Sequence, residues 1–127
     1  MAVAFGREGS VIAPVEMQRK LRRLCLSLPE TSEVAAWGHP NFRAGKRTFA
    51  VYETYKGRPC IAVKIDPLTR EGLLQHPSFF PTPIIGKHGW LSIWVDGPVD
   101  WNLIKKLVTG SYRLVALKRM LANLEER

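Results

Sequence analysis

Residues 84–95 read Ile84-Ile85-Gly86-Lys87-His88-Gly89-Trp90-Leu91-Ser92-Ile93-Trp94-Val95. This stretch predicts a β-hairpin, because an apolar run and a glycine-containing turn precede a strand in which aliphatic side chains alternate. The alternation places one aliphatic face toward a core and leaves two indoles around a hydroxyl on the other face. These two faces are Leu91, Ile93, Val95 and Trp90, Ser92, Trp94. We therefore expect the fold to be built around this strand.

The chain before the hairpin contains two predicted helices separated by strands. Apolar residues recur at helical spacing behind Pro14, which predicts a helix at 14–27 with a core face and a basic face. Alternating or β-branched runs then predict strands at 34–37, 47–55 and 59–65. Asp66-Pro67 is a strong helix start, so the next helix is predicted from there to residue 75.

The C-terminal part is predicted to be helical. Prolines at 81 and 83 make residues 79–85 an edge or irregular strand. After the hairpin, Asp100 can cap a helix that begins at Trp101. Gly110 is predicted to break this helix, and Ser111 is predicted to cap a final one.

This order of elements defines the expected architecture. It reads helix, three strands, helix, two strands and one or two C-terminal helices. Short adjacent strands favour an antiparallel sheet, so we predict a two-layer α+β domain with five antiparallel strands and helices packed on them. A chain of 127 residues has the size of one domain. Residues 1–13 show no period and are predicted to be a flexible arm, followed by a single domain at 14–127.

Composition excludes several classes of protein. With 46% hydrophobic and 24% charged residues, the chain has the composition of a folded globular protein. It lacks an apolar run near the ~20 residues of a membrane span, so no membrane partner is expected. The N-terminus lacks the pattern of a signal peptide, which predicts a cytoplasmic location. Cys25 and Cys60 are far apart in apolar surroundings and are interpreted as reduced thiols.

Five short segments together resemble a known family. They are residues 21–30 (Leu-Arg-Arg-Leu-Cys-Leu-Ser-Leu-Pro-Glu), Gly38-His39-Pro40-x-Phe42, Val63-Lys64-x-Asp66-Pro67, Gly86-Lys87-x-Gly89-Trp90 and Ser111-Tyr112-x-Leu114-Val115. In this order they resemble the MmcQ/YjbR family of small bacterial proteins, over about residues 17–120. The resemblance implies an α-β3-α-β2-α fold similar to that of type III secretion chaperones. Members are commonly described as DNA-binding, because the fold resembles a double-wing phage transcription factor.

The charge of the chain favours a polyanionic partner. A formal net charge of +8 attracts polyanions at long range. Together with the description of the family, it leads to the hypothesis of weak DNA binding through phosphate contacts, largely independent of base sequence. The proposed contacts are the cations of the first helix and of the loops: Arg19, Lys20, Arg22, Arg23, Arg43, Lys46, Arg47, Lys56, Arg58 and Lys87.

Aromatic residues suggest a second hypothesis. Four of them, with Lys64 among them, are predicted to converge on the outer face of the sheet: Trp37, Tyr52, Trp90 and Trp94. One interpretation is a second small core covered by the C-terminal helix or the arm. The other is a platform that stacks bases or holds a peptide. By analogy with secretion chaperones, the alternative function is a protein- or peptide-interaction module.

Catalytic and metal-binding motifs are not found in the sequence. His39, His76 and His88 lack the spacing of a metal site, and no cysteine joins them. Ser111 lies outside any G-x-S-x-G motif, and the glycines form no phosphate-binding loop. The sequence therefore predicts a protein that is not an enzyme, with no catalytic residue, metal or cofactor.

Overall fold

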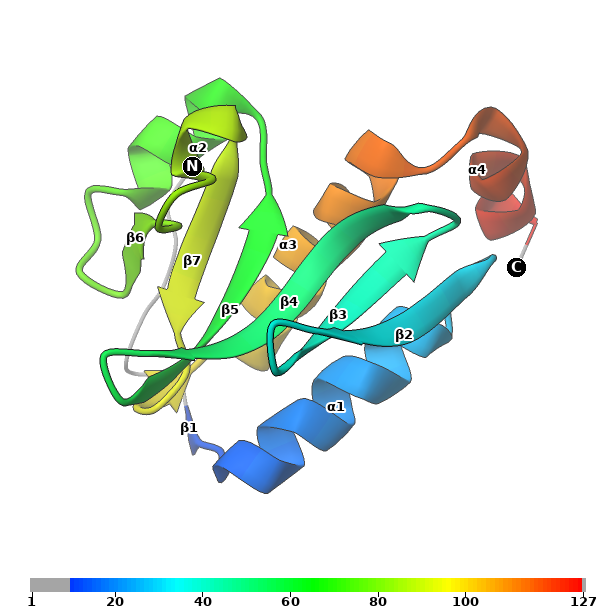
Figure 1. Cartoon of the computed structure of the whole chain (residues 1–127). Coiled ribbons are helices and arrows are strands. Elements are labelled where there is room, and N and C mark those ends of the chain that lie inside the picture. The colour runs from blue at the N-terminus through cyan, green and yellow to red at the C-terminus, as the bar shows by residue number, and fades with distance from the viewer. Residues whose placement is uncertain (1–9, 127) are drawn as a thin grey trace.

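Six antiparallel strands form the main sheet, in the spatial order β2-β3-β4-β5-β7-β6 (Figure 1). A computed structural model describes residues 10–126. The strands are β2 (Thr31–Ala36), β3 (His39–Ala44), β4 (Arg47–Tyr55), β5 (Arg58–Lys64), β6 (Phe79–Pro81) and β7 (Trp90–Trp94). Strands β2 and β6 are the two edges, and β3, β4, β5 and β7 lie between them.

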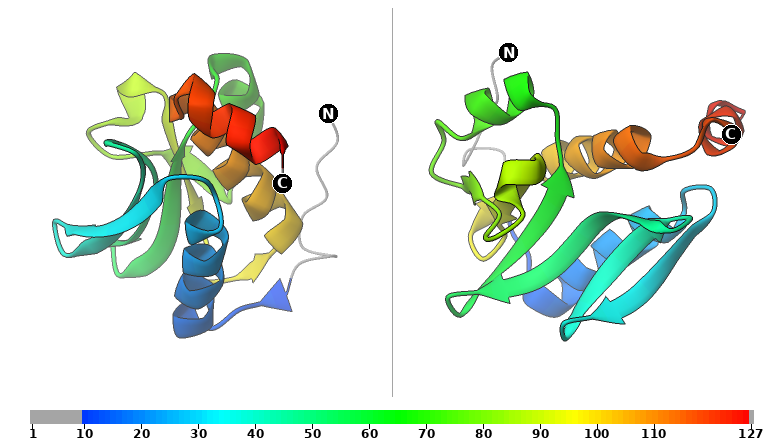
Figure 2. Two further views of the ribbon diagram at one scale, coloured as in Figure 1. Left: turned by 90° about the vertical axis from the view of Figure 1, so that its right-hand side faces the viewer. Right: turned by 45° about the horizontal axis from the view of Figure 1, so that its top comes forward.

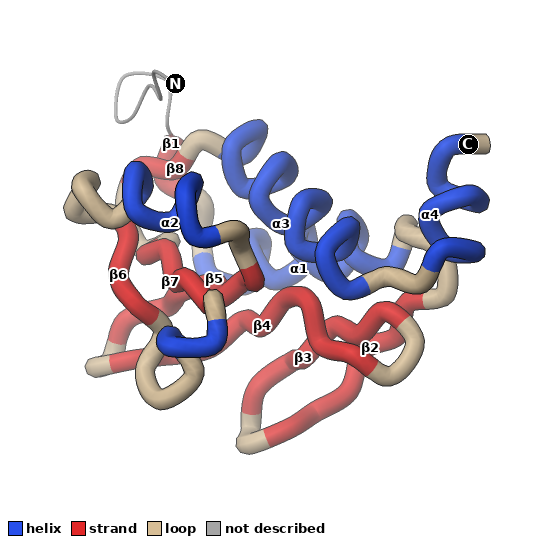
Figure 3. The backbone as a smooth tube through the Cα atoms, turned by 90° about the horizontal axis from the view of Figure 1, so that it is seen from above, coloured by secondary structure: helices blue, strands red, loops and turns tan. Residues whose placement is uncertain are grey.

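Helices cover one face of this sheet. They are α1 (Pro14–Leu26), α2 (Pro67–Leu73), α3 (Trp101–Val115) and α4 (Lys118–Glu125). Helices α1 and α3 lie side by side on the same face, and we call the opposite side the open face (Figures 2 and 3). A 3-10 turn, η1 (Gly86–His88), directly precedes β7 and lies on the other side of the sheet (Figure 3). A separate two-stranded pair joins β1 (Ser10–Val11) to β8 (Pro98–Val99). Among residues 10–126, no helix has the length and apolarity that crossing a membrane requires.

The core lies between the sheet and helices α1 and α3. The aliphatic face predicted for residues 90–95 is buried here, and Leu91, Ile93 and Val95 are almost inaccessible to solvent. Across the sheet, Val63 of β5 pairs with Leu91. Helix α1 contributes Met17, Leu21 and Cys25 to the same core, and α3 contributes Ile104, Val108 and Tyr112. The prediction that Leu91, Ile93 and Val95 form a core face is therefore confirmed.

The predicted sheet was one strand short. Residues 38–41 read as a turn in the sequence, but only Trp37 and Gly38 form the turn between β2 and β3, and strand β3 begins at His39. Pro40 is tolerated there because the pairing of β3 with β4 starts only at Asn41, so the missing N–H of Pro40 removes no donor from that ladder. Four strands of the main sheet therefore precede α2, where the sequence predicted three. Strands β1 and β8 do not belong to the main sheet.

A β-bulge in β4 changes which side chains share a face. Phe42 pairs with Ala50 and Arg43 pairs with Thr48, so Phe49 is an extra residue without a partner. As a result Phe49 and Ala50 are both buried, although they are consecutive. Strict alternation along residues 47–55 would place Phe49 and Val51 on one face, and the bulge breaks that pattern.

The predicted hairpin and the last helices also differ in detail. Ile84 and Ile85 belong to a long loop, and the strand paired with β7 is β6, which Pro81 ends. Helix α3 continues through Gly110, because its buried side chains outweigh the ~1 kcal/mol propensity cost of glycine. Ser111 is consequently not a cap. Its buried hydroxyl donates to the Phe49 carbonyl (2.6 Å) and accepts from the Lys64 N–H (2.8 Å), joining α3 to β4 and β5.

Candidate functional site

A cleft of about 620 Å³ lies on the open face of the sheet. Its floor is formed by β4, β5 and β7 through Val51, Glu53, Ala62 and Trp90. One wall is the β2–β3 hairpin, and the other is the loop of residues 82–85, which Figure 3 shows projecting from the same side of the sheet, away from the helices. Cavities of this size are typical of ligand-binding sites.

Both walls are held by hydrogen bonds. In the hairpin, Asn41 donates from Nδ2 to the His39 carbonyl (3.0 Å) and, more weakly, to the Ala36 carbonyl (3.3 Å). In the opposite wall, the hydroxyls of Thr82 and Ser92 are both buried and lie 2.9 Å apart. The Gly86 N–H donates to the Thr82 carbonyl at 2.7 Å, which closes a turn over residues 82–86. The cleft is therefore shaped in advance of any ligand.

The two walls end in large exposed apolar side chains. Trp37 is 96% exposed at the tip of the hairpin, and Ile84 is 90% exposed in the loop. Both residues also have positive φ angles, +56° for Trp37 and +69° for Ile84. This conformation is unfavourable for bulky and β-branched side chains, by roughly 1–2 kcal/mol each. Two strained and unburied apolar residues, from two different elements, thus line one cleft.

Glu53 places a carboxylate on the floor of the cleft. It makes no hydrogen bond or ion pair within residues 10–126, and it is only partly accessible. Burial raises the pKa of Glu53 above its ordinary value, and the nearby His39 offsets this rise in part. His39 lies opposite Glu53 if the register of β3 and β4 is extended by two residues beyond the Asn41–Val51 pair.

A stack of aromatic rings lies beside the cleft on the same face. Phe80 stacks on Trp94 with ring centroids 4.2 Å apart, and on Tyr55 at 5.6 Å. The guanidinium of Arg58 covers the Trp94 ring at 4.0 Å and forms two hydrogen bonds to Asp96 (2.6 and 3.0 Å). The Trp94 ring is therefore in contact with protein through both Phe80 and Arg58.

The structure divides the four predicted platform residues. Trp37 and Trp90 both line the cleft, and Trp94 belongs to the neighbouring aromatic stack. Tyr52 lies on the other face of the sheet, 5% exposed within the core, because the bulge at Phe49 shifts the alternation of β4. Tyr52 therefore takes no part in an open-face platform. Tyr55, from the same strand, lies on the open face, where Tyr52 was predicted to lie.

The predicted DNA contacts are distributed over several edges of the molecule. Lys46 lies in the turn before β4 and Arg47 begins β4, while Lys56 lies in the turn after β4 and Arg58 begins β5. At ~3.3 Å per residue, the nine residues of β4 separate these turns by roughly 30 Å. Lys87 lies in η1. The residues of α1, which are Arg19, Lys20, Arg22 and Arg23, belong to the helical layer.

Several of these cations already have partners. Arg22 makes a bidentate ion pair with Glu33 (2.6 and 3.0 Å), and Arg19 lies 3.2 Å from Glu16. Lys20 lies 5.0 Å from the ring centroid of Trp101 in α3.

Arg43 in β3 differs from these cations, because its Nε is buried without a hydrogen-bond partner in the described part of the chain.

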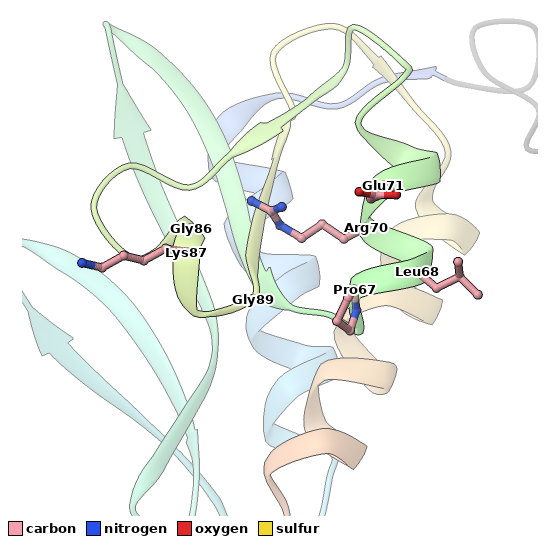
Figure 4. A pocket seen from close by; sticks show the side chains of 7 residues that line it. All are labelled: Pro67, Leu68, Arg70, Glu71, Gly86, Lys87 and Gly89. Atoms are coloured by element: carbon pink, nitrogen blue, oxygen red, sulfur yellow. The ribbon is translucent and has the colours of Figure 1, made fainter.

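A second hollow, of about 510 Å³, lies between α2 and η1 (Figure 4). Arg70 extends toward η1 and donates weakly to the Trp90 carbonyl at 3.4 Å. The side chains of Lys87 and Leu68, however, extend away from the hollow in Figure 4. Its charged groups do not converge, so it is a weaker candidate than the open-face cleft.

The comparisons with known proteins match most of the chain. The model of the YjbR family matches residues 26–114. The chain belongs to the YjbR family. The resemblance seen in the sequence is thus confirmed.

Relatives of this YjbR protein have been found by sequence and by structure. The proteins named "Uncharacterized protein YjbR" from Escherichia coli K12 and O157:H7 are each 27% identical over 97 residues, covering 74% of this chain and 82% of the relative. A crystal structure from Deinococcus radiodurans has a TM-score of 0.72 and 28% identity, covering 85% of this chain and 87% of that one. One from Pseudomonas syringae, with a TM-score of 0.67, 17% identity and coverages of 76% and 97%, shows the fold alone.

Among residues 10–126 of this YjbR protein, no group of three or more histidine, cysteine or acidic side chains could hold a metal ion. Cys25 and Cys60 are buried free thiols, and burial raises the pKa of Cys60 to about 12.

Sequence reasoning missed Glu53, His39 and Ile84 as members of one site. The usable signal was Glu53, a carboxylate between Val51 and Tyr55 on an otherwise apolar strand face.

Proposed function

We propose that this YjbR protein is a binding module that holds an apolar segment of another protein in the open-face cleft. The observation that carries this proposal is the exposure of Trp37 and Ile84 on opposite walls of one cavity. Exposed large apolar side chains that gather around a concave surface mark interaction sites. Aromatic anchors such as Trp37 are frequent at the energetic centre of such interfaces.

Backbone strain supports the same proposal. A two-residue hairpin turn with both φ angles positive is normally occupied by Asn-Gly or Asp-Gly, yet Trp37-Gly38 occupies it here. Replacing Trp37 by asparagine would relieve strain and remove an exposed indole. Residues held in strained conformations occur often at binding sites, where the geometry itself serves the function.

The test is selection of short random peptides displayed on phage by the immobilised full-length protein. Peptides selected by the wild type should bind the double variant Trp37→Ala/Ile84→Ala at least about tenfold more weakly, since truncated anchor residues commonly cost more than ~1.4 kcal/mol. The matched control is Leu68→Ala, because Leu68 is as large and apolar as Ile84 and is 84% exposed, but it lies on α2, outside the open-face cleft. Failure to select any peptide, or equal weakening by the control, would contradict the proposal.

A second function, weak DNA binding, is favoured by the net charge of +8. The loop cations Lys46, Arg47, Lys56 and Lys87 are exposed and make no ion pair within the described residues, so they are available to phosphates. If these four cations each neutralise one phosphate, log K should fall with log salt with a slope of ~−3.6.

Fluorescence anisotropy of labelled duplex DNA at two salt concentrations measures this slope. The variant Lys46→Gln/Arg47→Gln should flatten it by up to ~2 units. Arg19→Gln is the control, because Arg19 is already paired with Glu16. Absence of binding at low salt, up to ~100 μM protein, would end the DNA hypothesis.

A further inference from the structure

The carboxylates of this protein differ in their need for a partner. Within residues 10–126, most of them are in ion pairs (Glu16, Glu30, Glu33, Asp96, Glu125) or accept hydrogen bonds as helix caps (Asp66, Asp100). Three others make neither contact: Glu53, Glu71 and Glu126. Glu71 and Glu126 are exposed, whereas Glu53 is the one of the three that is partly shielded from solvent.

The position of Glu53 makes its lack of a partner costly. The carboxylate lies on a floor formed by Val51 and Ala62, so part of its hydration is lost. A desolvated charge without a counter-charge destabilises the folded protein. Loss of hydration is also the main reason why the pKa of Glu53 is raised. A cationic group entering the cleft would supply the counter-charge.

We propose that the cleft selects protein segments in which a lysine or arginine side chain lies next to an apolar residue, with Glu53 binding the cation. This inference rests on the proposed function and names the chemistry of its partner. The apolar residue would contact Trp37 and Ile84, and the cation would lie on the floor between the two walls.

The rest of the lining suits such a side chain. Lysine and arginine carry long aliphatic stems that pack on apolar surfaces while the charged end stays at a polar group. Trp90 and Tyr55 line the cleft together with Glu53, and aromatic faces attract cations. A phosphate or an acidic side chain would instead meet the negative charge of Glu53. Nucleic acid is therefore a poor occupant of this cleft.

The experiment compares selections from the same phage-displayed library of random peptides on three full-length proteins. Wild type should enrich peptides with lysine or arginine beside an apolar residue. Glu53→Gln should still select apolar residues but lose the basic ones, and it should bind the lysine peptides about tenfold or more weakly, as expected for a lost charge-assisted hydrogen bond. Glu71→Gln, which removes an exposed carboxylate elsewhere, should behave as wild type.

A charge reversal completes the design. Glu53→Lys should shift the selected peptides from basic to acidic residues, a change that a merely structural role of Glu53 would not produce. Selection of apolar peptides without basic residues, by a wild type whose binding needs Trp37 and Ile84, would overturn the role of Glu53 and leave the proposed function standing. Failure of the wild type to select any peptide would overturn both.

Discussion

Replacing Glu53 by glutamine should make the free protein more stable. The substitution keeps the shape of the side chain and removes its charge, so the apolar floor of the cleft no longer surrounds an unpaired carboxylate. Stability and function are often opposed at binding sites, where residues are retained for their ligand. Glu53 is the residue at which this protein should show that opposition.

The size of the effect follows from the position of the side chain. A buried polar group without a partner costs about 1–3 kcal/mol. Glu53 is partly accessible, and attraction from His39 offsets some of its desolvation, so we expect about half of that cost, or ~0.5–1.5 kcal/mol. For a domain of this size, a gain of ~1 kcal/mol raises the melting temperature by roughly 3–5 °C.

The assay is urea unfolding of wild type and Glu53→Gln across a range of pH, followed by tryptophan fluorescence. Because the pKa of Glu53 is raised in the folded state, its destabilising effect is fully present above the folded pKa and vanishes below the unfolded pKa, ~4.3. The variant should therefore exceed wild type at neutral pH, and the difference should shrink as pH falls. Glu71→Gln, at an exposed carboxylate, should show no such difference.

Two results would refute this reasoning. If Glu53→Gln were less stable than wild type at neutral pH, the carboxylate would have a stabilising partner, and its proposed need for a ligand cation would fail. If the gain were present but independent of pH, it would come from something other than the charge.

Three further predictions concern the framework that supports the cleft. Ser111→Ala leaves one N–H and one carbonyl without their buried partner, so urea unfolding should show a loss of about 2–4 kcal/mol. Gly45→Ala combines a φ of +60° with a Cβ only 2.9 Å from Met120 Cε, and thermal unfolding should show a loss of about 1–3 kcal/mol. The hydrogen bond from Arg22 lowers the pKa of Glu33 in the folded protein. The stability that this ion pair contributes is therefore present above the unfolded pKa of Glu33 and is lost as pH falls through the folded pKa. Glu33→Gln should flatten the acid side of the profile of stability against pH, and an unchanged profile would exclude a contribution from this pair.

Much of the fold could be predicted from local sequence patterns. Period-2 alternation gave the buried face of β7 correctly, and Asp66-Pro67 gave the start of α2, where Asp66 accepts a hydrogen bond from the Thr69 N–H (2.9 Å). The alternation in β7 and the Asp66-Pro67 helix start both depend only on residues that are close together in the chain.

The errors arose where tertiary contacts override local patterns. Gly110 looked like a helix end, but side chains packed on the sheet carry α3 past it. The bulge at Phe49 has no local signature, and it reversed the predicted face of Tyr52. A bulge depends on pairing between strands, which a single strand pattern does not contain.

The same limit applied to the site. Glu53, His39 and Ile84 come from β4, β3 and the loop after β6, so strand pairing and the position of that loop bring them around one cleft. The excess of positive charge, in contrast, was visible from composition. The ion pairs of Arg22 and Arg58 could not be predicted, because their acidic partners are distant in the sequence.

The location of binding is the central claim, and the four tryptophans report on it directly. Each indole N–H gives its own NMR signal. Trp37 and Trp90 line the cleft, Trp94 lies in the aromatic stack, and Trp101 lies on α3 beside Lys20. The measurement is a titration of the ¹⁵N-labelled protein with a selected lysine-containing peptide. The signals of Trp37 and Trp90 should shift together while that of Trp101 stays in place; a shift of Trp101 with Trp37 and Trp90 unchanged would contradict the account.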